Sequence, residues 1–356
     1  MALRTILVAA GGTGGHLYPG IAVADELVRR DPSVRVVFAG TPRGLESRIV
    51  PRAGYPLELL PILPLNGVGL GRTLLGVLAL PWGLLRALRL VLRLRPAAVL
   101  GVGGYAGGPV ALVAALLGVR TVILEPNAKP GFTNRVLRPF VAAAACAFED
   151  ARAFYGPKGV LTGNPVRGGF TALGTKAAGP LKTLLVFGGS QGSLVLNEAM
   201  IRALPHLPGP ERLHLVHQTG PSPRDAVAAA YATAGREAEV VAYLDDMEVR
   251  FAAADLVVSR SGATTCAELQ AAGKAAVLVP LARAANDHQR VNAEAMAAQG
   301  AAVVVEEKDL TGASLAQAIA GLLQDEPRLA AMGRSARARS RPDAAARVAD
   351  LLVGDA

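Results

Sequence analysis

Short runs of aliphatic and β-branched residues alternate with stretches of helical periodicity along almost the whole chain. In the first half the apolar runs cover residues 5–9, 34–39, 97–101 and 121–124. In the second half they cover residues 183–187, 213–217, 240–243, 256–259, 275–279 and 301–305. Helical periodicity occupies the intervals, most clearly at 16–29, 193–203, 264–272 and 286–298. Regular strand–helix alternation predicts an α/β fold built on parallel sheets.

The two halves of the chain resemble each other. The segment Thr5-Ile-Leu-Val-Ala-Ala-Gly-Gly-Thr-Gly-Gly is similar to Thr183-Leu-Leu-Val-Phe-Gly-Gly-Ser-Gln-Gly, which begins 178 residues later. Each is a predicted buried strand that runs into a glycine turn and a helix. We therefore expect two doubly wound α/β domains. One domain spans residues 1–162 together with a final helix that crosses back at 341–356, and the other spans 163–340.

Two apolar segments are long enough to raise the question of whether they span a membrane. Residues 96–119 carry no charge, but six glycines and Pro109 interrupt them, so we predict a buried strand, a glycine loop and a helix begun by Pro109. Residues 70–95 mix leucines and Trp82 with five arginines, and their uncharged part, 73–85, is too short to span a bilayer. They suit either the surface of an anionic membrane or a core helix whose arginines are solvated.

Composition narrows the class of protein further. A length of 356 residues favours two domains, and 51% hydrophobic with 18% charged residues excludes a disordered chain. Two cysteines allow neither a disulfide scaffold nor a cysteine zinc cluster, which suits a reducing cytoplasm. The net charge of +9 favours anionic partners, while only 4% aromatic residues speak against nucleic acid. The apolar start of the chain lacks a cleavage pattern, so we interpret it as a strand.

The first glycine loop, residues 11–15, is followed by His16. Glycines let helix N-terminal amides approach a phosphate closely, although a tight turn without a ligand would have the same sequence. A dinucleotide fingerprint is disfavoured because Leu17 replaces its last glycine. The strand ending at Thr41 also lacks the acidic residue that would bind a ribose. Similar loops at 101–109 and 188–192 also follow predicted strands, so all three predict one crevice that binds several phosphates.

Two polar segments follow later strands. In residues 261–268, Ser and Thr could simply cap a helix with Glu268 in its first turns, or the Glu268 carboxylate could accept ribose hydroxyls. Residues 286–290, Asn-Asp-His-Gln-Arg, are either a solvated helix start or a site for sugar hydroxyls.

Eight motifs occur in order along the chain: Gly11-Gly-Thr-Gly-Gly-His-x-x-Pro19, Gly103-Gly-Tyr-Ala-Gly-Gly-Pro109, Asn127-Ala-Lys-Pro-Gly-Phe-Thr-Asn-Arg135, Gly163-Asn-Pro-Val-Arg167, Gly188-Gly-Ser-Gln-Gly192, Leu244-Asp-Asp-Met247, Arg260-Ser-Gly-Ala-Thr-Thr-Cys-Ala-Glu268 and Asp287-His-Gln-x-x-Asn292. Together they give the chain a resemblance, over nearly its whole length, to one family, the bacterial peptidoglycan N-acetylglucosaminyltransferases that convert lipid I into lipid II.

The resemblance implies a type B glycosyltransferase fold, an α/β fold with two Rossmann-like, doubly wound domains facing a cleft. Its first domain would bind lipid I at an anionic membrane surface, and its second would bind UDP-N-acetylglucosamine. It places the enzyme peripherally on the cytoplasmic face of the plasma (inner) membrane and leaves the oligomeric state open. The donor contacts it implies are Thr13, Gly14, Gly15, Asn127, Arg167, Ser190, Leu244, Met247, Ala263, Thr264, Thr265, Glu268, His288 and Gln289. The acceptor contacts it implies are Gly103, Gly104 and Tyr105. Pro126 departs from the family, which often has a glutamine there, so no side-chain donor is expected at 126.

An α-linked donor and a β-linked product imply one displacement with inversion. We assign His16 as the base that takes the acceptor proton, against the alternative that it only orients the loop. Arg167 and the amides after Ser190 would meet the leaving UDP. The chain has no Asp-x-Asp motif, so we expect no metal site and no cofactor. The alternatives are a UDP-sugar epimerase on the same fold and a non-catalytic lipid or anion binder.

Overall fold

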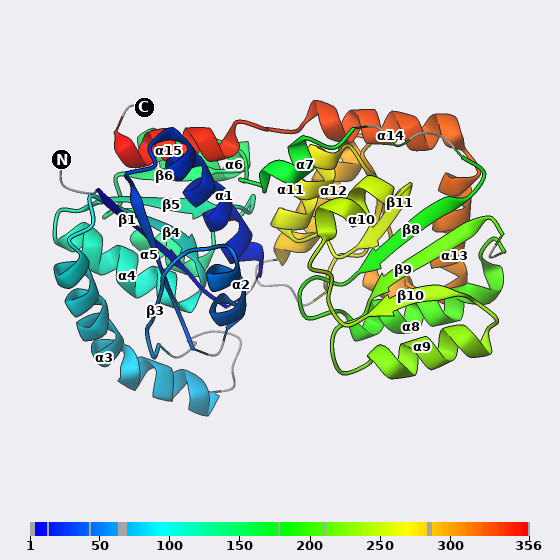
Figure 1. The fold of residues 1–356 in the computed structure, drawn as a ribbon, viewed down its shortest axis with the longest axis horizontal. Coiled ribbons are helices and arrows are strands. Elements are labelled where there is room, and N and C mark those ends of the chain that lie inside the picture. The colour runs from blue at the N-terminus through cyan, green and yellow to red at the C-terminus, as the bar shows by residue number, and fades with distance from the viewer. Residues whose placement is uncertain are drawn as a thin grey trace. The chain divides into compact units, whose positions relative to one another are not determined.

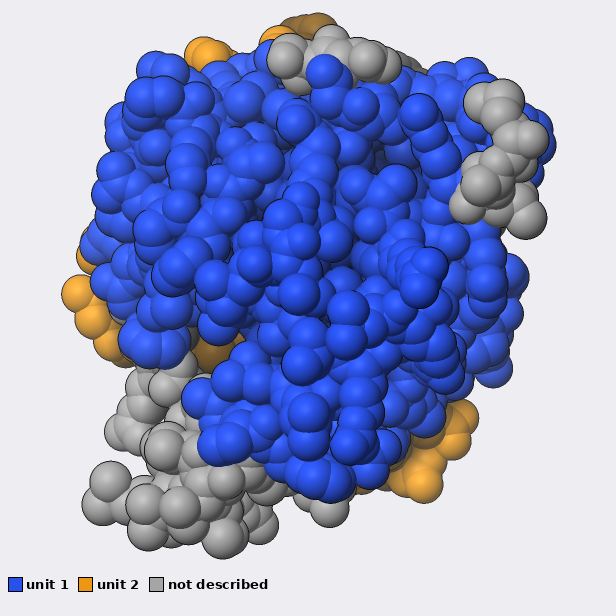
Figure 2. Space-filling view, turned by 90° about the vertical axis from the view of Figure 1, so that its left-hand side faces the viewer, with its two compact units in different colours: residues 1–167, 341–356 blue, residues 168–340 orange. Residues whose placement is uncertain are grey.

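The computed structural model describes residues 4–354 except 13, 43, 63–69, 175, 177–178, 210 and 283–286, and it describes only the backbone of 70–79 and 105–106. The chain divides into two compact units, Met1–Arg167 with Arg341–Ala356 and Gly168–Ser340 (blue and orange in Figure 2). The first boundary falls five residues later than the sequence predicted, because the segment 163–167 packs with unit 1.

Unit 1 is built on a seven-stranded sheet with the order β3-β2-β1-β4-β5-β6-β7, and all of its strand pairs are parallel (Figure 1). The strands are β1 (Thr5–Ala10), β2 (Arg35–Gly40), β3 (Leu57–Leu59), β4 (Ala98–Gly103), β5 (Arg120–Glu125), β6 (Ala143–Cys146) and β7 (Gly159–Leu161). Four were predicted. The three short strands β3, β6 and β7, which lie at or next to the edges of the sheet, were missed.

Both faces of this sheet are covered, which explains the continuous apolar runs of its central strands. Successive residues of β1 point to opposite faces: Ile6 and Val8 belong to one core cluster, and Leu7 to another. The first cluster includes residues of α1 and α15, and the second includes residues of α3 and α4. The helices of unit 1 are α1 (Gly14–Arg30), α2 (Glu46–Arg52), α3 (Leu70–Leu94), α4 (Gly104–Leu116), α5 (Phe132–Leu137), α6 (Glu149–Tyr155) and α15 (Ala344–Val353).

The two long apolar segments of the sequence, 70–95 and 96–119, each contribute a helix to unit 1. Residues 70–94 form the single helix α3, with Pro81 inside it. The helix after the second glycine loop was predicted to begin at Pro109, which is wrong: α4 begins at Gly104 and contains Pro109. Among the described residues, none of the helices combines the length and apolar content needed to cross a membrane.

The final helix returns to unit 1, as the sequence suggested. In α15, Val348 and Leu352 are buried in the same cluster as β1 and α1. At its rim, Arg30 pairs with Asp350 at 2.5 Å, and Arg120 Nε donates to the Leu351 carbonyl at 2.7 Å. The unit is therefore closed by residues distant in sequence.

Unit 2 contains a six-stranded sheet with the order β10-β9-β8-β11-β12-β13, again parallel in every pair (Figure 1). All six strands were predicted: β8 (Lys182–Phe187), β9 (Leu213–Gln218), β10 (Ala238–Val241), β11 (Leu256–Ser259), β12 (Ala275–Leu278) and β13 (Ala302–Val304). The helices are α7 (Gly168–Thr171), α8 (Leu194–Ala203), α9 (Arg224–Thr233), α10 (Met247–Ala253), α11 (Ala263–Ala272), α12 (His288–Ala298), α13 (Gly312–Leu323) and α14 (Glu326–Ala338).

The two faces of this second sheet bury different side chains. Leu184 and Val186 pack with α8 and α13 in the largest core cluster. On the other side, Phe187 and Phe170 both contact the Phe251 ring, with centroids 5.9 and 5.0 Å from it. Strands β8, β11 and β12 are thus buried on both faces, and their carboxyl ends lead directly into the predicted site segments.

Candidate functional site

The two glycine loops of unit 1 lie directly against each other. Gly104 has φ = +77°, and a Cβ built there would lie 2.0 Å from the Gly11 carbonyl oxygen. Gly103 has φ = +104°, and its Cβ would lie 2.8 Å from the His16 ring. Only glycine therefore allows these approaches. Because β1 and β4 are neighbours in the sheet, their loops converge, and they bring together Gly14, Gly15, His16, Gly103 and Gly104.

A buried carboxylate braces the first of these loops. Glu46 is fully buried and accepts hydrogen bonds from Thr41 N at 2.7 Å, Thr41 Oγ1 at 2.8 Å and Gly12 N at 3.2 Å. Sequence reasoning missed Glu46. Its signal is its position on the same helical face as Ile49 and Val50, where a side chain is expected to be buried. The carboxylate ties the end of β2 to the loop that carries His16.

His16 lies in the first turn of α1 and is half-buried. Two residues further along this helix, the Tyr18 ring is covered by the Arg167 guanidinium, whose Cζ lies 4.2 Å from the ring centroid. This stacking is a cation–π contact and holds Arg167 in unit 1. The predicted leaving-group contact is therefore positioned by the helix that also carries the candidate base.

A second buried carboxylate organises the loop after β5. Glu125 accepts hydrogen bonds from Gly131 N, Asn127 N and Asn134 Nδ2 at 3.0, 3.2 and 2.9 Å. Burial raises the pKa of Glu125 despite these donors. Asn127 is half-buried, and its Nδ2 lies 3.5 Å from Glu125 Oε1. The predicted sugar contact at Asn127 therefore depends on Glu125 and Asn134, which sequence reasoning did not single out.

In unit 2 the loop 188–192 follows β8 and is packed against the turn after β9. A Cβ on Gly192, whose φ is +75°, would lie 2.0 Å from the Thr219 carbonyl oxygen. Gln218 Nε2 donates to the Gly189 carbonyl at 3.0 Å. Ser193 Oγ accepts from Leu196 N and caps α8. Ser190 thus lies in the loop, three residues before the cap of a ten-residue helix whose N-terminal amides favour an anion.

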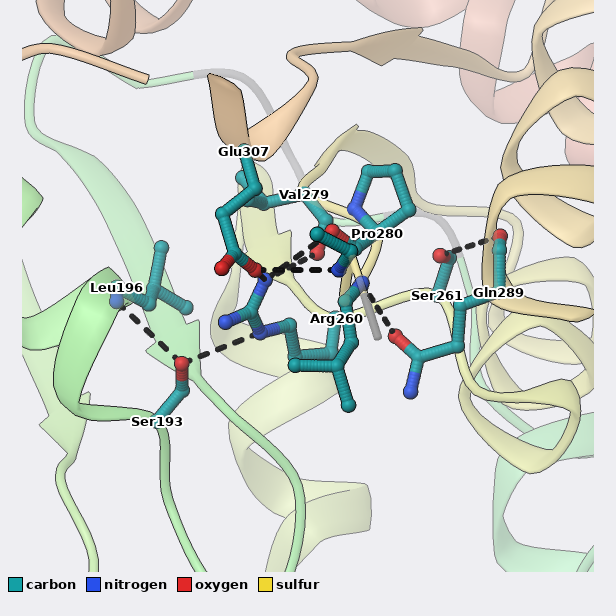
Figure 3. A network of polar contacts seen from close by, with 10 residues as sticks. Ser193, Leu196, Arg260, Ser261, Val279, Pro280, Gln289 and Glu307 are labelled. Carbon is teal, nitrogen blue, oxygen red and sulfur yellow. Dashed lines mark hydrogen bonds and ion pairs between the residues drawn. The ribbon is translucent and has the colours of Figure 1, made fainter. Parts of the chain in front are cut away.

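A network around Arg260 joins this loop to two others (Figure 3). Arg260 is 7% exposed, and its Nε donates to Ser193 Oγ at 3.1 Å. Its Nη1 lies 2.7 Å from Glu307 Oε2 and also donates to the carbonyls of Val279 and Pro280. The guanidinium therefore fixes the ends of β8, β11 and β12 together. Arg260 stood in a recognised motif, but sequence reasoning gave it no role.

The predicted ribose segment forms the start of α11. The helix cap is Gly262 rather than the expected Ser or Thr, because Ser261 Oγ donates to the Gln289 carbonyl at 2.7 Å instead. Ala263, Thr264 and Thr265 form the first turn and are half-buried. Glu268, predicted to bind the ribose, is only 6% exposed, and sits in the helix interior. The segment 261–268 therefore lies directly after the carboxyl end of β11, as the sequence predicted.

The remaining donor candidates in unit 2 lie after β10 and β12. Leu244 is buried, Met247 begins α10, and His288 begins α12. The Gln289 carboxamide oxygen accepts from Leu281 N at 3.1 Å (Figure 3), so one end of this side chain is used inside the protein. Asp246 stands at the N-cap of α10, but its side chain makes no capping hydrogen bond. Instead, the Asp246 carboxylate pairs with Arg250 at 2.9 Å.

Three further positions lie either outside the described residues or in the core. Thr13 and the side chain of Tyr105 lie outside the described residues. His217, at the end of β9, is fully buried between Tyr231 OH at 2.9 Å and Asn197 Oδ1 at 3.1 Å. Burial lowers the pKa of His217 to about 4, so the ring is neutral at pH 7 and serves the core. Within the described ranges, no three His, Cys, Asp or Glu residues are grouped as metal ligands.

The comparisons with known proteins agree with this architecture. Two parallel doubly wound sheets with glycine loops at their carboxyl edges match the type B glycosyltransferase fold. Residues 6–146 match the glycosyltransferase family 28 N-terminal domain, and residues 183–348 match its C-terminal domain. The chain belongs to glycosyltransferase family 28.

Two similar relatives carry the name UDP-N-acetylglucosamine--N-acetylmuramyl-(pentapeptide) pyrophosphoryl-undecaprenol N-acetylglucosamine transferase. The one from Myxococcus xanthus is 47% identical over 99% of this chain and 93% of its own. The one from Citrifermentans bemidjiense is 42% identical over 98% and 99%. Among solved structures, MurG of Acinetobacter baumannii is 33% identical, with a TM-score of 0.77 over 99% of both chains.

A more distant structure shares the fold alone. The UDP-GlcNAc 2-epimerase of Neisseria meningitidis, bound to UDP-GlcNAc, has a TM-score of 0.72 over 99% of this chain and 100% of its own, but only 12% identity. At this level of identity the similarity shows a shared fold and nothing more.

Proposed function

We propose that this protein transfers N-acetylglucosamine from UDP-N-acetylglucosamine to the 4-hydroxyl of the N-acetylmuramyl unit of lipid I, giving lipid II for peptidoglycan synthesis. The observation that carries the proposal is identity of 42–47% to relatives named for this transfer, spread over nearly the full length of both chains. Unit 1 would receive the lipid-linked acceptor, and unit 2 the nucleotide of the donor.

The first step of the reaction needs a base for the acceptor hydroxyl. We assign it to His16, whose ring lies over Gly103 at the junction of two glycine loops. An imidazole titrates near neutrality and can accept a proton at physiological pH. Gly103, Gly104 and Tyr105 would lie beside the acceptor, because they belong to the loop that contacts His16. Thr13, Gly14 and Gly15 would contact the transferred sugar and the acceptor phosphates from the other loop.

The departing UDP needs positive charge near its phosphates. We assign Arg167, stacked on Tyr18, and the backbone amides around Ser190 to this task, since a guanidinium and a helix N-terminus both favour phosphate oxygens. Leu244 and Met247 would border the uracil, and Ala263, Thr264, Thr265 and Glu268 the ribose and phosphate. Asn127, His288 and Gln289 would contact N-acetylglucosamine. With these groups we expect no requirement for a metal ion or cofactor.

We also propose that unit 1 binds an anionic membrane surface, as a peripheral protein on the cytoplasmic face of the plasma membrane. Supporting this, α3 exposes Trp82 and Leu92 to solvent at 51% and 55%, and the Arg86 guanidinium lies 5.1 Å from the Trp82 ring centroid. Apolar rings flanked by arginines bind the interface of anionic bilayers. Vesicles containing phosphatidylglycerol should co-sediment the protein, and vesicles of phosphatidylcholine should not. Arg86→Glu should weaken the binding, and equal binding to both vesicles would contradict the proposal.

The experiment that tests the reaction is a turnover assay with a lipid I analogue and UDP-N-acetylglucosamine, in the presence and absence of EDTA. Transfer should require both substrates and survive the chelator. His16→Ala should lose roughly 10²–10⁴-fold in kcat. Full turnover by that variant would remove His16 from the base role. A new UDP-sugar formed without any acceptor would identify an epimerase instead.

A further inference from the structure

Unit 2 contains a cavity at the edge of its sheet opposite to the candidate site. The cavity has a volume of about 530 Å³. It is lined by residues at the amino ends of three adjacent strands: Lys182 begins β8, Asp255 precedes β11, and Lys274 precedes β12. The proposed donor segments follow the carboxyl ends of the same strands. With strands of four to six residues, the two regions lie roughly 13–20 Å apart along the sheet.

The lining of this cavity is dominated by positive charge. Five cationic side chains line it against two carboxylates. Lys176 pairs with Asp255 at 2.5 Å, and Lys182 pairs with Glu326. The remaining three cations, Lys274, Arg334 and Arg337, have no carboxylate partner among the described residues.

Lys274 lies in the wall of the cavity and is only 6% exposed. Two of its three N–H donors are directed to the carbonyls of Ala254 and Ala252, at 2.7 and 3.2 Å, and no described residue accepts the third. Burial lowers its pKa to about 8, with the Lys176 and Arg337 cations acting in the same direction against Asp255. A buried ammonium beside like charges is costly, and a bound anion would relieve that cost.

Two arginines of α14 complete the basic wall. Arg337 Nη2 donates to the carbonyls of Leu173 and Ala272, at 2.7 and 3.0 Å, so its guanidinium is held in place. Arg334 lies one turn earlier on the same helix and is exposed. A fixed guanidinium, a buried ammonium and a free arginine together make a site for an anion with several oxygens.

We propose that this cavity binds a small anion carrying one or two phosphate groups, at a site separate from the donor and acceptor sites. Its volume falls within the range of small-molecule pockets and exceeds that of a single phosphate. The ligand's phosphate oxygens would accept from Lys274 Nζ and Arg334. The inference is independent of the proposed transfer reaction, because it concerns binding at the opposite edge of the sheet.

The test is calorimetric titration of inorganic pyrophosphate into the full-length protein held saturated with UDP. We expect one binding site per chain. At pH 8, in two buffers of different ionisation enthalpy, binding should take up protons, because an anion beside Lys274 raises its pKa from about 8. Arg334→Ala should weaken binding about tenfold, which corresponds to loss of one hydrogen-bonded charge.

Arg328→Ala is the matched control, since Arg328 is an exposed arginine of the same helix that does not line the cavity. It should leave the affinity unchanged. Lys274→Met, checked for folding by circular dichroism, should weaken binding and abolish the proton uptake. Equal affinity in wild type, Arg334→Ala and Lys274→Met would overturn the proposal. An apparent affinity that falls as UDP is raised would place pyrophosphate in the donor site and would also overturn it.

Discussion

The glycine loops of the two units are held in place by different kinds of interaction. In unit 1, the loops after β1 and β4 touch through their backbones, and the Glu46 carboxylate binds the first loop by accepting a hydrogen bond from Gly12 N. In unit 2, Gly192 of the loop after β8 also lies against the turn after β9. This loop is bound in addition by side-chain hydrogen bonds from Gln218 and Arg260, and the turn is bound by one from Asn197. A close backbone contact leaves no room for an added side-chain atom. A network of hydrogen bonds can lose one bond at a time, so we expect its support of the loop to weaken gradually.

The largest effect should come from Gly104→Ala in unit 1. The new Cβ would lie 2.0 Å from the Gly11 carbonyl oxygen at a residue with φ = +77°, so the two loops must separate. We expect a loss of about 3 kcal/mol or more in the free energy of unfolding and at least a hundredfold loss of transfer. Chemical denaturation and the turnover assay measure the two effects.

Gly118→Ala provides the control for backbone strain alone. Its φ is +76°, but nothing lies within 4 Å of its Cβ position. It should cost about 1 kcal/mol and leave transfer unchanged. If Gly118→Ala and Gly104→Ala behaved alike, strain rather than the contact between the loops would explain the effect.

The Arg260 network of unit 2 should be the next most sensitive feature. Arg260→Met leaves the Glu307 carboxylate and two carbonyls without their donor, at a cost of about 2–3 kcal/mol, discounted because the Glu307 side chain is 22% exposed. The donor KM should rise, because the residue positions the loop that carries Ser190. Arg290→Met, which removes a surface arginine with 44% side-chain exposure, should change stability by less than about 1 kcal/mol. An unchanged donor KM in Arg260→Met would refute this positioning role.

Acid should weaken unit 2 through His217. Its folded-state pKa of about 4 lies below the ordinary value of 6.5, so the folded protein binds fewer protons than the unfolded chain between these values. Stability is fully present above pH 6.5 and falls as the pH drops toward 4, by up to about 3 kcal/mol. Glu125 in unit 1 has the opposite sign, since its raised pKa favours the folded state as the pH falls.

Unfolding titrations at pH 7 and pH 4.5 measure this difference. His217→Gln should flatten the acid dependence, and the exposed His206→Gln should leave it as in the wild type. A His217→Gln variant with the wild-type pH slope would show that other groups dominate.

The smallest expected effect is on the first loop. Glu46→Gln keeps the shape of the side chain but turns an amide group toward the N–H donors of Gly12 and Thr41. We expect a loss of about 1–2 kcal/mol in stability and a fall in kcat with little change in donor KM. Glu149→Gln, at an exposed side chain of α6, should do neither. A rise in donor KM without a fall in kcat would contradict the role of Glu46 in bracing the loop that carries His16.

Local sequence patterns were sufficient for most of the fold. Strands β8, β11 and β12 of unit 2 and the four central strands of unit 1 are buried on both faces, and their unbroken apolar runs can be recognised without any tertiary information. The start of α4 was predicted five residues too late, because proline is common in the first turn of a helix. The helix begins instead at Gly104, which lies against Gly11 of the other loop. Short edge strands such as β3 exist only because a neighbour supplies their hydrogen bonds.

The sequence by itself determined which loops carry glycine and which strands precede them, because backbone conformation and burial leave a local mark on residue type. Tertiary structure alone decided which side chains support those loops. Glu46, Glu125 and Arg260 are charged residues whose importance comes from partners brought to them by sheet order. The same is true of the basic cavity, whose cations come from residues 176 to 337 and meet only because three parallel strands begin side by side.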